Sequence, residues 1–485
     1  MQIHTTLMYK FKTEPYEHQK DALKKCWNKE AFAIFAEMGT GKSKIALDNA
    51  CILYNKGKID RVLIVAPKGT YMNWVDQEIP THVPDYVEKH VVAWKQSTSA
   101  TYKQQLKDIK SADDFRFKIM VINVEALSTK KGVEFAHLFL IGRSMMIVDE
   151  STAIKNPQAK RTKNILSLAK ESKYRRILTG SPVTQSPMDL WAQMDFLDPD
   201  ILGQQSYYAF RTRYAVVITA NAAGGTHKYQ KIVKFKNLAQ LGQLVSPHSY
   251  RILKKDCLDL PDKVYTRREV ELTDEQQQAY SEMKTNAMTI LKGESLTAVN
   301  VLTQLIRLHQ ITCGHMKTDS GETLDLKNNR LDELMQILGE TTGKVIIWAN
   351  YIHDIERIKN AIVKEYGEDA CCTYYGATPT DERQVCIRKF QDSKSKVRFF
   401  IGNTQTGGYG ITLTEASTVI YYSNNYDLEK RIQSEDRAHR IGQKNSVLYI
   451  DLVAKGTVDE KIIKSLRNKV NIAKEISGEE FSNWI

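Results

Sequence analysis

Short apolar runs alternate with amphipathic, helix-like stretches in this chain, and the alternation occurs twice. Apolar runs of this length predict strands buried on both faces, and helical stretches between them predict parallel sheets built from βαβ units. The runs in the first half are Ala31–Ala36, Arg61–Ala66, Lys118–Ile122, Met145–Val148 and Arg175–Leu178. Those in the second half are Val345–Trp348, Val397–Ile401, Thr418–Tyr422 and Val447–Val453. The pattern predicts an α/β fold with two lobes in tandem.

The boundary between the lobes is expected between residues 236 and 265, and we place the lobes at residues 1–240 and 241–485. In the first lobe, two β-rich stretches around Asn221–Thr226 predict a small hairpin insertion near residues 214–236, because consecutive glycines suit a tight turn. The lysines that follow the turn fit a solvated edge hairpin or a nucleic-acid contact. A helical insertion is expected near residues 270–325 of the second lobe.

Composition excludes a mostly disordered chain, since hydrophobic residues make up 42% and charged residues 26% of the 485 positions. The net charge of +12 fits a polyanionic partner, but also a basic surface without one. Seven cysteines with no CxxC pair predict reduced thiols rather than a zinc site. The sequence shows neither a long apolar run nor a signal peptide, so we expect no membrane segment and a cytoplasmic location.

A phosphate-binding loop is predicted directly after the first expected strand. Ala36-Glu-Met-Gly-Thr-Gly-Lys-Ser43 matches the P-loop pattern with Ala in place of the first Gly, and a helical run follows it. Glycines let backbone N–H groups face phosphates, and the helix N-terminus adds positive potential. Lys42 supplies a charge for the β- and γ-phosphates, and Ser43 supplies an oxygen for Mg²⁺.

Two acids end the fourth expected strand. Asp149 and Glu150 follow an apolar run and are therefore expected at the carboxyl edge of the sheet, where open α/β folds bind ligands. Asp149 can hold Mg²⁺, and Glu150 can orient or deprotonate an attacking water. Such an acidic pair is common at strand ends, but together with Lys42 it predicts a nucleoside-triphosphate hydrolysis site.

Two arginines late in the chain suggest a motor rather than a kinase. Gln433, Arg437 and Arg440 have spacings of four and three, which predict one face of a helix. Arginines on a helix are ordinarily surface charges. If the two lobes close over the nucleotide, however, Arg437 and Arg440 can neutralise charge that develops on the γ-phosphate.

From about Pro15 to Ile463 the sequence resembles superfamily-two helicase-like ATPases, and more closely the Swi/Snf-type DNA translocases. The similar segments of the first lobe are Pro15–Gln19, Ala66–Trp74 with Glu78, Asp149–Thr152, Ile154–Asn156 and Leu178–Pro182. Those of the second are Leu305–His315, Tyr375–Gly376 with Arg383 and Phe390, Thr404–Gly410 and Asp436–Gln443. The last of these, with its Arg-Ile-Gly-Gln tail, is the most specific. Without segments typical of accessory domains, the chain looks like a compact prokaryotic or phage member, which would place it in the host cytoplasm if phage-encoded.

The sequence also departs from the family pattern at several positions. Thr152 stands where His is usual in the acidic box, and Ser181 stands for the common Thr. Gln405, Thr406 and Thr412 replace the usual Arg, Ala and Asn around the glycine-rich motif. The changes at Thr152 and Thr412 bear on the coupling of hydrolysis to movement rather than on ATP binding.

The resemblance implies two RecA-like lobes with the ATP site in the cleft between them, ATP and Mg²⁺ as ligands, and double-stranded DNA as partner. Catalytic roles then fall to Lys42, Asp149, Glu150, Arg437 and Arg440, and the metal ligands are Ser43 and Asp149. Nucleotide-binding residues are Gln19 as the adenine contact, Met38, Gly39, Thr40, Gly41, Lys42, Ser43, Gly408 and Gln433. Nucleic-acid contacts are Lys68, Gly69, Thr70, Thr404 and Gly407.

The leading hypothesis is an ATP-dependent translocase on double-stranded DNA. One alternative is a strand-separating helicase on DNA or RNA, which needs a wedge, and the Gly224-Gly225 hairpin is the only candidate for one. Another is a nucleotide-gated DNA clamp with little turnover, to which Thr152 and the altered glycine motif lend support. A small-molecule P-loop kinase is disfavoured by the second lobe and its arginines. No motif identifies a protein partner.

Overall fold

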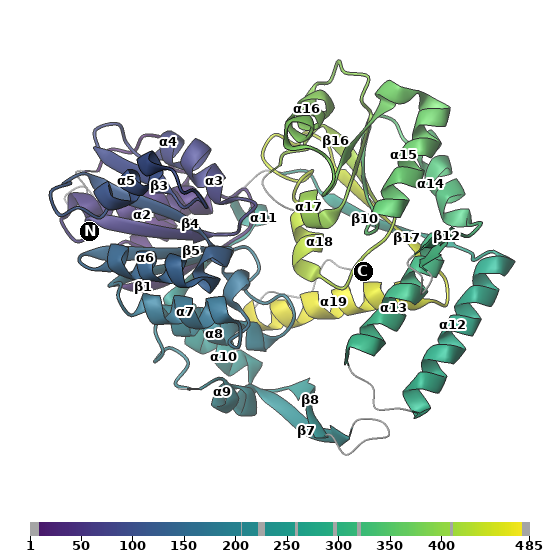
Figure 1. Ribbon diagram of the computed structural model, residues 1–485, viewed down its shortest axis with the longest axis horizontal. Coiled ribbons are helices and arrows are strands. Elements are labelled where there is room, and N and C mark those ends of the chain that lie inside the picture. Colours follow the sequence, from purple (N-terminus) through teal and green to yellow (C-terminus); the bar gives the residue numbers. More distant parts are fainter. Residues whose placement is uncertain are drawn as a thin grey trace. The chain divides into compact units, whose positions relative to one another are not determined.

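The computed structural model describes residues 9–204, 206–221, 228–257, 260–293, 298–317, 322–407 and 411–477. The chain divides into two compact units, each drawn in Figure 1. The first unit consists of Met1–Ala215, Phe235–Asp259 and Asn471–Ile485, and the second of Val216–Lys234 and Leu260–Val470. The chain therefore crosses between the units at the hairpin insertion as well as near residue 260.

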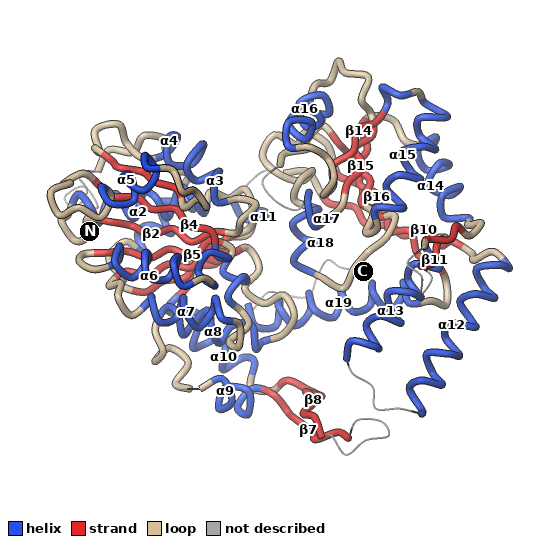
Figure 2. The backbone as a smooth tube through the Cα atoms, viewed as in Figure 1, coloured by secondary structure: helices blue, strands red, loops and turns tan. Residues whose placement is uncertain are grey.

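The first unit is built on a seven-stranded sheet in the order β3-β4-β2-β5-β6-β1-β9, and its strands pair in parallel (Figure 2). The strands are β1 (Ala31–Ala36), β2 (Arg61–Ala66), β3 (Lys89–Ala93), β4 (Phe117–Asn123), β5 (Ser144–Asp149), β6 (Tyr174–Thr179) and β9 (Ser249–Ile252). The five strands expected from the sequence are confirmed. β3 and β9 were not predicted, and both lie at the edges of the sheet. β9 follows residue 240 in the chain and still pairs with β1.

Helices connect the strands of this unit. They are α1 (Glu17–Cys26), α2 (Lys42–Asn55), α3 (Tyr71–Asn73), α4 (Ile79–His82), α5 (Ala100–Asp108), α6 (Lys130–Leu140), α7 (Lys160–Ala169), α8 (Leu190–Leu197), α9 (Tyr207–Tyr214), α10 (Leu238–Val245) and α11 (Lys254–Cys257). A π-helix, Trp74–Glu78, joins α3 to α4. Nearly every residue of α2 is buried, which fixes the helix that follows the phosphate-binding loop within the core.

The second unit has a six-stranded parallel sheet in the order β10-β17-β16-β13-β15-β14. The strands are β10 (Lys263–Val270), β13 (Lys344–Trp348), β14 (Cys371–Tyr374), β15 (Phe399–Gly402), β16 (Ala416–Tyr421) and β17 (Val447–Ala454). Along β13, Val345 and Ile347 join one hydrophobic cluster, and Ile346 and Trp348 join another. This alternation shows a strand buried on both faces. The four expected strands are confirmed, and the two edge strands, β10 and β14, were missed.

Helices and two small sheets complete the second unit. The helices are α12 (Asp274–Gly293), α13 (Ala298–Cys313), α14 (Asn329–Glu340), α15 (Ile352–Tyr366), α16 (Thr380–Gln391), α17 (Thr404–Gly407), α18 (Leu428–Glu435) and α19 (Val458–Ser477). β11 (His315–Lys317) pairs with β12 (Thr323–Asp325), and β7 (Ala215–Asn221) pairs with β8 (Lys228–Phe235). The expected glycine turn of the β7–β8 hairpin lies outside the described residues.

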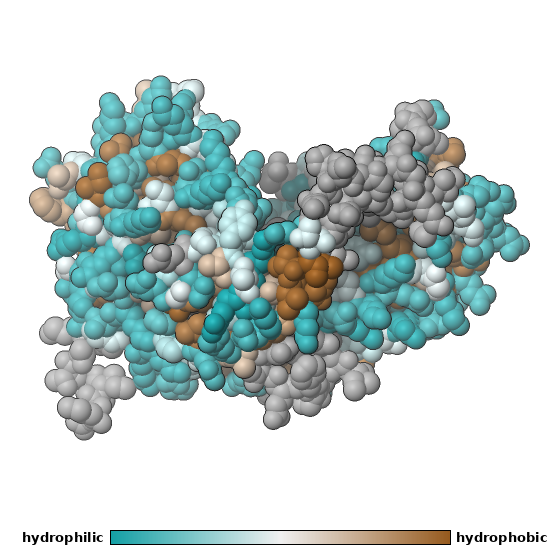
Figure 3. Space-filling model, turned by 90° about the horizontal axis from the view of Figure 1, so that it is seen from below, coloured by the Kyte–Doolittle hydropathy of each residue, from teal (hydrophilic) through white to brown (hydrophobic). Residues whose placement is uncertain are grey.

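Hydrophilic side chains dominate the face of the molecule shown in Figure 3, with apolar side chains gathered in smaller groups. None of the helices described is both long and apolar enough to cross a bilayer. Across the described positions, no three His, Cys, Asp or Glu side chains gather as a metal site. Cys313 and His315, which lie two residues apart in the sequence, are both buried.

One cysteine pair corrects the expectation of reduced thiols. Cys372 of β14 and Cys386 of α16 form a disulfide with a Cα–Cα distance of 5.7 Å, which is ordinary for such a bridge. The sequence offers no spacing that would identify this pair, because the contact arises only when α16 packs on β14. The other cysteines are free thiols.

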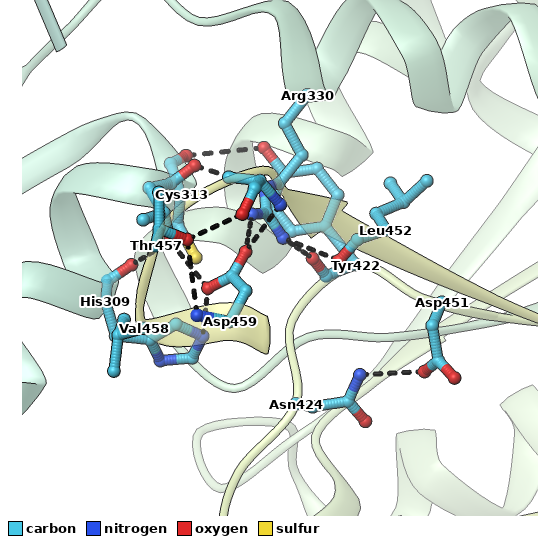
Figure 4. Close-up of polar contacts among 12 residues, drawn as sticks. His309, Cys313, Arg330, Tyr422, Asn424, Asp451, Leu452, Thr457, Val458 and Asp459 are labelled. Carbon is cyan, nitrogen blue, oxygen red and sulfur yellow. Dashed lines mark hydrogen bonds and ion pairs between the residues drawn. The ribbon is translucent and has the colours of Figure 1, made fainter. Parts of the chain in front are cut away.

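A buried ion pair joins several elements of the second unit (Figure 4). Arg330 of α14 is 1% exposed and pairs with Asp459 of α19. Its guanidinium also donates to the carbonyl oxygens of Thr312, Tyr422 and Leu452, at 3.1, 2.6 and 3.1 Å. Asp459 in turn accepts from the Thr312 hydroxyl at 3.0 Å. Every charge is thus satisfied, which a buried pair requires if it is not to destabilise the fold.

We expect Arg330→Met to lower the free energy of unfolding of the second unit by about 3–5 kcal/mol, because it leaves a buried carboxylate without its partner. Chemical denaturation followed by circular dichroism measures the change. Arg268→Met is the matched control: its ion pairs with Glu333 and Glu340 lie on the surface, so its loss should change stability little. Equal effects of the two substitutions would contradict the prediction.

Candidate nucleotide and nucleic-acid sites

The phosphate-binding loop connects β1 to α2 in the first unit. Gly39 and Gly41 have φ angles of 84° and 87°, which side-chain-bearing residues rarely adopt. Gly41 is the N-cap of α2. A Cβ atom at Gly41 would also lie 2.2 Å from Nε2 of Gln19, so a larger residue there would displace the Gln19 amide. The loop therefore has both the backbone conformation and the helix N-terminus that suit phosphate binding.

Gln19, the expected adenine contact, lies against this loop. Its Nε2 donates to the Thr40 carbonyl at 3.1 Å, and its Oε1 accepts from the backbone N–H of Tyr16 at 3.1 Å. His18 also contacts the Thr40 carbonyl, at 2.9 Å. The structure thus brings Gln19 to the nucleotide site, where it holds the loop; its contact with adenine stays a prediction.

Asp149 and Glu150 stand at the carboxyl end of β5, as expected. The Lys42 ammonium lies 3.9 Å from Oε1 of Glu150, so the loop and the acidic pair meet. Glu150 is one of two described non-glycine residues with positive φ, at 45°. A left-handed conformation at a large side chain costs roughly 1–3 kcal/mol and is typical of functional sites. Burial raises the pKa of Asp149 above its usual value, while Lys42 acts in the opposite direction.

The indole of Trp74 contacts Asp149, and no spacing in the sequence predicts this contact. Trp74 Nε1 donates to Oδ2 of Asp149 at 2.9 Å, and the backbone N–H of Glu150 donates to Oδ1 at 3.0 Å. Trp74 was recognised only as part of a family segment. A buried aromatic residue that carries one polar atom was the available signal, since such atoms ordinarily find a partner.

The acidic box is tied to the segment that the resemblance assigns to coupling. Ser151 donates to Oε1 of Gln193 at 2.6 Å, and Nε2 of Gln193 donates to the carbonyl of Pro182 at 2.7 Å. A Cβ atom at Gly180 would lie 3.4 Å from the carbonyl oxygen of Ala36. The coupling segment therefore contacts both the acidic box and the start of the phosphate-binding loop. Gln193 was not singled out from the sequence.

The chain that leaves the first unit is bonded to the same loop. Glu37 accepts from the backbone N–H of Lys254 at 2.8 Å, and the Glu37 N–H donates to the carbonyl of Ile252 at 3.0 Å. Arg251 donates to the carbonyl of Gly180 at 2.7 Å. The exit segment thus touches the phosphate-binding loop and the coupling segment before it reaches the second unit.

The structure corrects the expected geometry of the second-unit arginines. Gln433 lies on α18, but this helix ends at Glu435, so Arg437 and Arg440 lie in the turns that follow. Arg437 is 1% exposed and donates to the carbonyls of Gln433 and Ile411, at 3.1 and 3.2 Å. Arg440 is half-buried and donates to Ile411 at 3.3 Å. The two arginines therefore meet at one carbonyl group rather than along one helix face.

The last residue of this segment fixes the turns. Nε2 of Gln443 donates to the carbonyls of Thr414, Ala416 and Ala438, at 3.0, 2.8 and 3.1 Å. Its Oε1 accepts from the backbone N–H groups of Lys444 and Asn445, at 2.9 and 3.0 Å. Gln443 thus contacts five backbone groups, with the two N–H donors of its amide shared among three carbonyls, which explains why glutamine suits the end of the segment.

The expected nucleic-acid contacts follow strands in both sheets. Lys68 and Gly69 are exposed in the turn after β2, and Thr70 closes that turn with a backbone bond of 2.9 Å to Pro67. Thr404 begins α17 after β15 and is mostly buried. A Cβ atom at Gly407 would lie 2.5 Å from Trp348, so packing requires glycine there. Gly408 lies outside the described residues.

The residues of the first unit fit a nucleoside triphosphate with Mg²⁺. The glycine conformations free the loop N–H groups for phosphates, and Lys42 and the two acids converge at the same end of the sheet. The hydroxyl of Ser43 and the carboxylate of Asp149 are the oxygen donors that Mg²⁺ prefers.

Comparison with known proteins agrees with this geometry. Residues 18–317 match the SNF2-related domain, and residues 326–442 match the helicase conserved C-terminal domain. The chain belongs to the SNF2-related family. The resemblance to Swi/Snf-type ATPases is confirmed. The match to the first domain extends across the start of the second unit and through α13.

Several known proteins are similar over most of this chain. Protein CHROMATIN REMODELING 4 of Arabidopsis thaliana is 25% identical over 94% of the chain and 21% of its own length. The SWI/SNF chromatin-remodeling complex subunit snf22 of Schizosaccharomyces pombe is 28% identical over 92% and 27%. The putative ATP-dependent helicase/translocase YwqA of Bacillus subtilis is 28% identical over 87% and 44%. The chain thus spans less than half the length of these relatives.

Among solved structures, the Sulfolobus solfataricus SWI2/SNF2 ATPase core in complex with dsDNA aligns with 98% of this chain and 96% of its own. The sequence identity is 25% and the TM-score 0.44.

Two substitutions separate nucleotide binding from hydrolysis. Lys42→Ala should weaken binding of a fluorescent ATP analogue by roughly 10- to 150-fold, because a hydrogen bond to a charged group contributes about 1.5–3 kcal/mol. Glu150→Gln should leave binding near the wild-type value and lower turnover by about 10²- to 10⁴-fold, the contribution of a general base. Equilibrium titration and a phosphate-release assay measure the two effects. Normal turnover by the Glu150→Gln protein would refute the role given to Glu150.

Proposed function

We propose that this chain is a DNA-dependent ATPase that hydrolyses ATP with Mg²⁺ to move along double-stranded DNA. The observation that carries the proposal is the approach of Lys42 to Glu150, at 3.9 Å, beside Asp149 in an SNF2-related chain. A phosphate-binding cation and two acids at one sheet edge constitute the machinery of triphosphate hydrolysis. The roles proposed below for the other residues depend on this assignment.

Each residue of the first-unit site has a distinct task. The N–H groups of the glycine loop and Lys42 bind the phosphates, and Ser43 and Asp149 hold Mg²⁺ through oxygen. Bound Mg²⁺ would neutralise charge on the β- and γ-phosphates. Glu150 orients the attacking water and accepts its proton. Its left-handed backbone fixes the direction of the carboxylate before substrate arrives.

The second unit supplies the arginines in this proposal. Arg440 and Arg437 are proposed to stabilise charge that builds on the γ-phosphate, the role that the family resemblance implies for them. Arg440 is the more accessible of the two, since Arg437 is 1% exposed and bonded to two carbonyls. Arg437 would have to exchange the Ile411 carbonyl for phosphate during closure.

Double-stranded DNA is the proposed track, held mainly through its phosphates. Lys68 is exposed at the end of β2, and the net charge of the chain is +12. Contacts to the backbone of DNA make binding salt-dependent and nearly indifferent to sequence. One similar protein, YwqA of Bacillus subtilis, bears the name putative ATP-dependent helicase/translocase.

A strand-separating helicase is the second candidate, favoured by one observation. β7 and β8 form a separate two-stranded sheet, which is the shape that a strand-separating wedge would need. Described residues along it, such as Val216 and Ile218, expose apolar side chains. A wedge must also unstack bases, which costs a few kcal/mol per step.

Arg440→Ala should lower the DNA-stimulated turnover on the order of 10³-fold, the low end for an arginine that stabilises the transition state. Nucleotide affinity should change much less, because the first unit makes most ground-state contacts. Arg388→Ala, an exposed arginine on α16, is the control and should leave the rate unchanged. Arg437→Ala needs a thermal-unfolding measurement beside it, because Arg437 also bonds two backbone carbonyls. A rate within a few-fold of wild type for Arg440→Ala would make Arg440 a surface charge only.

Parallel ATPase assays without nucleic acid and with single strands, duplex DNA and RNA test the proposed function. Duplex DNA should stimulate most, and binding should weaken with salt by a slope of about 0.9 per phosphate contact. The protein should displace the third strand of a triplex at the expense of ATP and separate a forked duplex poorly.

Robust fork unwinding, with single strands as the better activator, would decide for the helicase instead. Deletion of residues 221–226 would then test the wedge. If every substrate leaves the rate at its basal value while DNA still binds, the nucleotide-gated clamp is the correct description.

A further inference from the structure

We propose that Trp74 is a positioning residue of the nucleotide site, whose indole N–H holds the Asp149 carboxylate in the orientation that receives Mg²⁺. The inference rests on the proposed function, since it specifies how the metal-binding carboxylate of that site is prepared. Trp74 itself contacts neither nucleotide nor metal in this proposal; it acts through Asp149.

The hydrogen bonds of Asp149 divide its two oxygens between two donors. Oδ2 accepts the Trp74 indole N–H at 2.9 Å, and Oδ1 accepts the backbone N–H of Glu150 at 3.0 Å. Two donors from different elements fix the plane of a carboxylate, whereas one would leave it free to rotate. Partners of metal-ligating carboxylates tune affinity in this way.

Burial makes the indole a rigid donor. Trp74 is 2% exposed and belongs to the hydrophobic core of the first unit, so its ring cannot turn away from Asp149 without a cavity. Because the indole is shielded from water, its hydrogen bond to Asp149 is stronger than the same bond would be on the surface. The contact is therefore worth more than an exposed one, and its loss would leave part of the carboxylate unsatisfied.

The backbone around Trp74 is unusual in a way that bears on this contact. Trp74 opens the π-helix Trp74–Glu78, in which the N–H of Ile79 bonds the carbonyl of Trp74. The α-helical segments α3 and α4 flank it without a break. Single π-turns are rare and concentrate at functional sites, because the extra residue re-aims a side chain. The indole that bonds Asp149 is the first side chain of this π-turn.

The same helical run begins at the proposed DNA contact. Lys68 and Gly69 are exposed in the turn after β2, and the run from Tyr71 follows directly. Trp74 thus belongs to the segment that touches DNA in the proposed function and is bonded to the carboxylate that touches Mg²⁺.

The test compares Mg²⁺-dependent nucleotide binding by wild-type protein and Trp74→Phe, with a fluorescent ADP analogue and no DNA. Phe keeps an aromatic ring but lacks the N–H. We expect Trp74→Phe to need about 10-fold more Mg²⁺ for half-maximal binding, the low end for loss of a partner of a metal ligand. Affinity in EDTA should stay within two-fold of wild type, a split that a merely packing role would not produce.

Two further proteins make the result decisive. Trp94→Phe is the matched control, because Trp94 packs its ring on Phe135 at 5.3 Å in the same unit and should show wild-type Mg²⁺ dependence. Replacement of Trp74 by 3-benzothienylalanine, which puts sulfur in place of the N–H at nearly the same shape, removes the donor while keeping the packing. This isostere covers the case in which Trp74→Phe does not fold.

Unchanged Mg²⁺ dependence in the isostere would overturn the inference and leave Trp74 a packing residue. Equal loss of affinity with Mg²⁺ and in EDTA would overturn it too, since it would mean general damage to the loop. A wild-type chain that binds no nucleotide under any condition would instead refute the proposed function. The readout needs neither hydrolysis nor DNA, so the two failures are distinct.

Discussion

Parallel pairing in the centre of the first sheet is the constraint on which the nucleotide site depends. β5 lies between β2 and β6, and β6 pairs with β1, all in parallel. The register sets Val65 beside Val148 and Asp149 beside Leu178. Segments that follow these strands therefore emerge at one edge. That edge receives the phosphate-binding loop, the acidic pair, the coupling segment and the turn that begins α3, although they are far apart in the chain.

The same constraint explains which strands the sequence revealed. β1, β2 and β5 are buried along nearly their whole length and therefore read as unbroken apolar runs. The strands of the two large sheets that were missed all lie at sheet edges: β3, β9, β10 and β14. Each alternates or mixes exposed and buried positions, as in the Ser-Tyr-Arg-Ile of β9, where only Ile252 is buried. An edge strand has no second neighbour to cover it, so its sequence resembles a loop.

The sequence predicts those site residues that directly follow a strand in the chain. It does not predict contacts between segments that are far apart in the chain. The glycines, Lys42 and the acidic pair follow strands directly, and the predicted strands place them. The hydrogen bonds from Trp74 to Asp149 and from Ser151 to Gln193 join segments that are 75 and 42 residues apart, and no sequence pattern links them. The prediction that Gln433, Arg437 and Arg440 share one helix face was wrong for a local reason. α18 ends at Glu435, so helical spacing does not apply to the two arginines.

The strained backbone of Glu150 and the partly buried carboxylate of Asp149 are stabilised by contacts within the same site. Glu150 holds a left-handed backbone at φ 45°, and the carboxylate of Asp149 is partly buried. Neither condition is favourable by itself. Glu150 approaches Lys42 to 3.9 Å, while Asp149 accepts from Trp74 and from the Glu150 N–H. The N–H that fixes Asp149 thus belongs to the strained residue itself. The backbone conformation that costs free energy at Glu150 is therefore also the one that places its N–H against the carboxylate of Asp149.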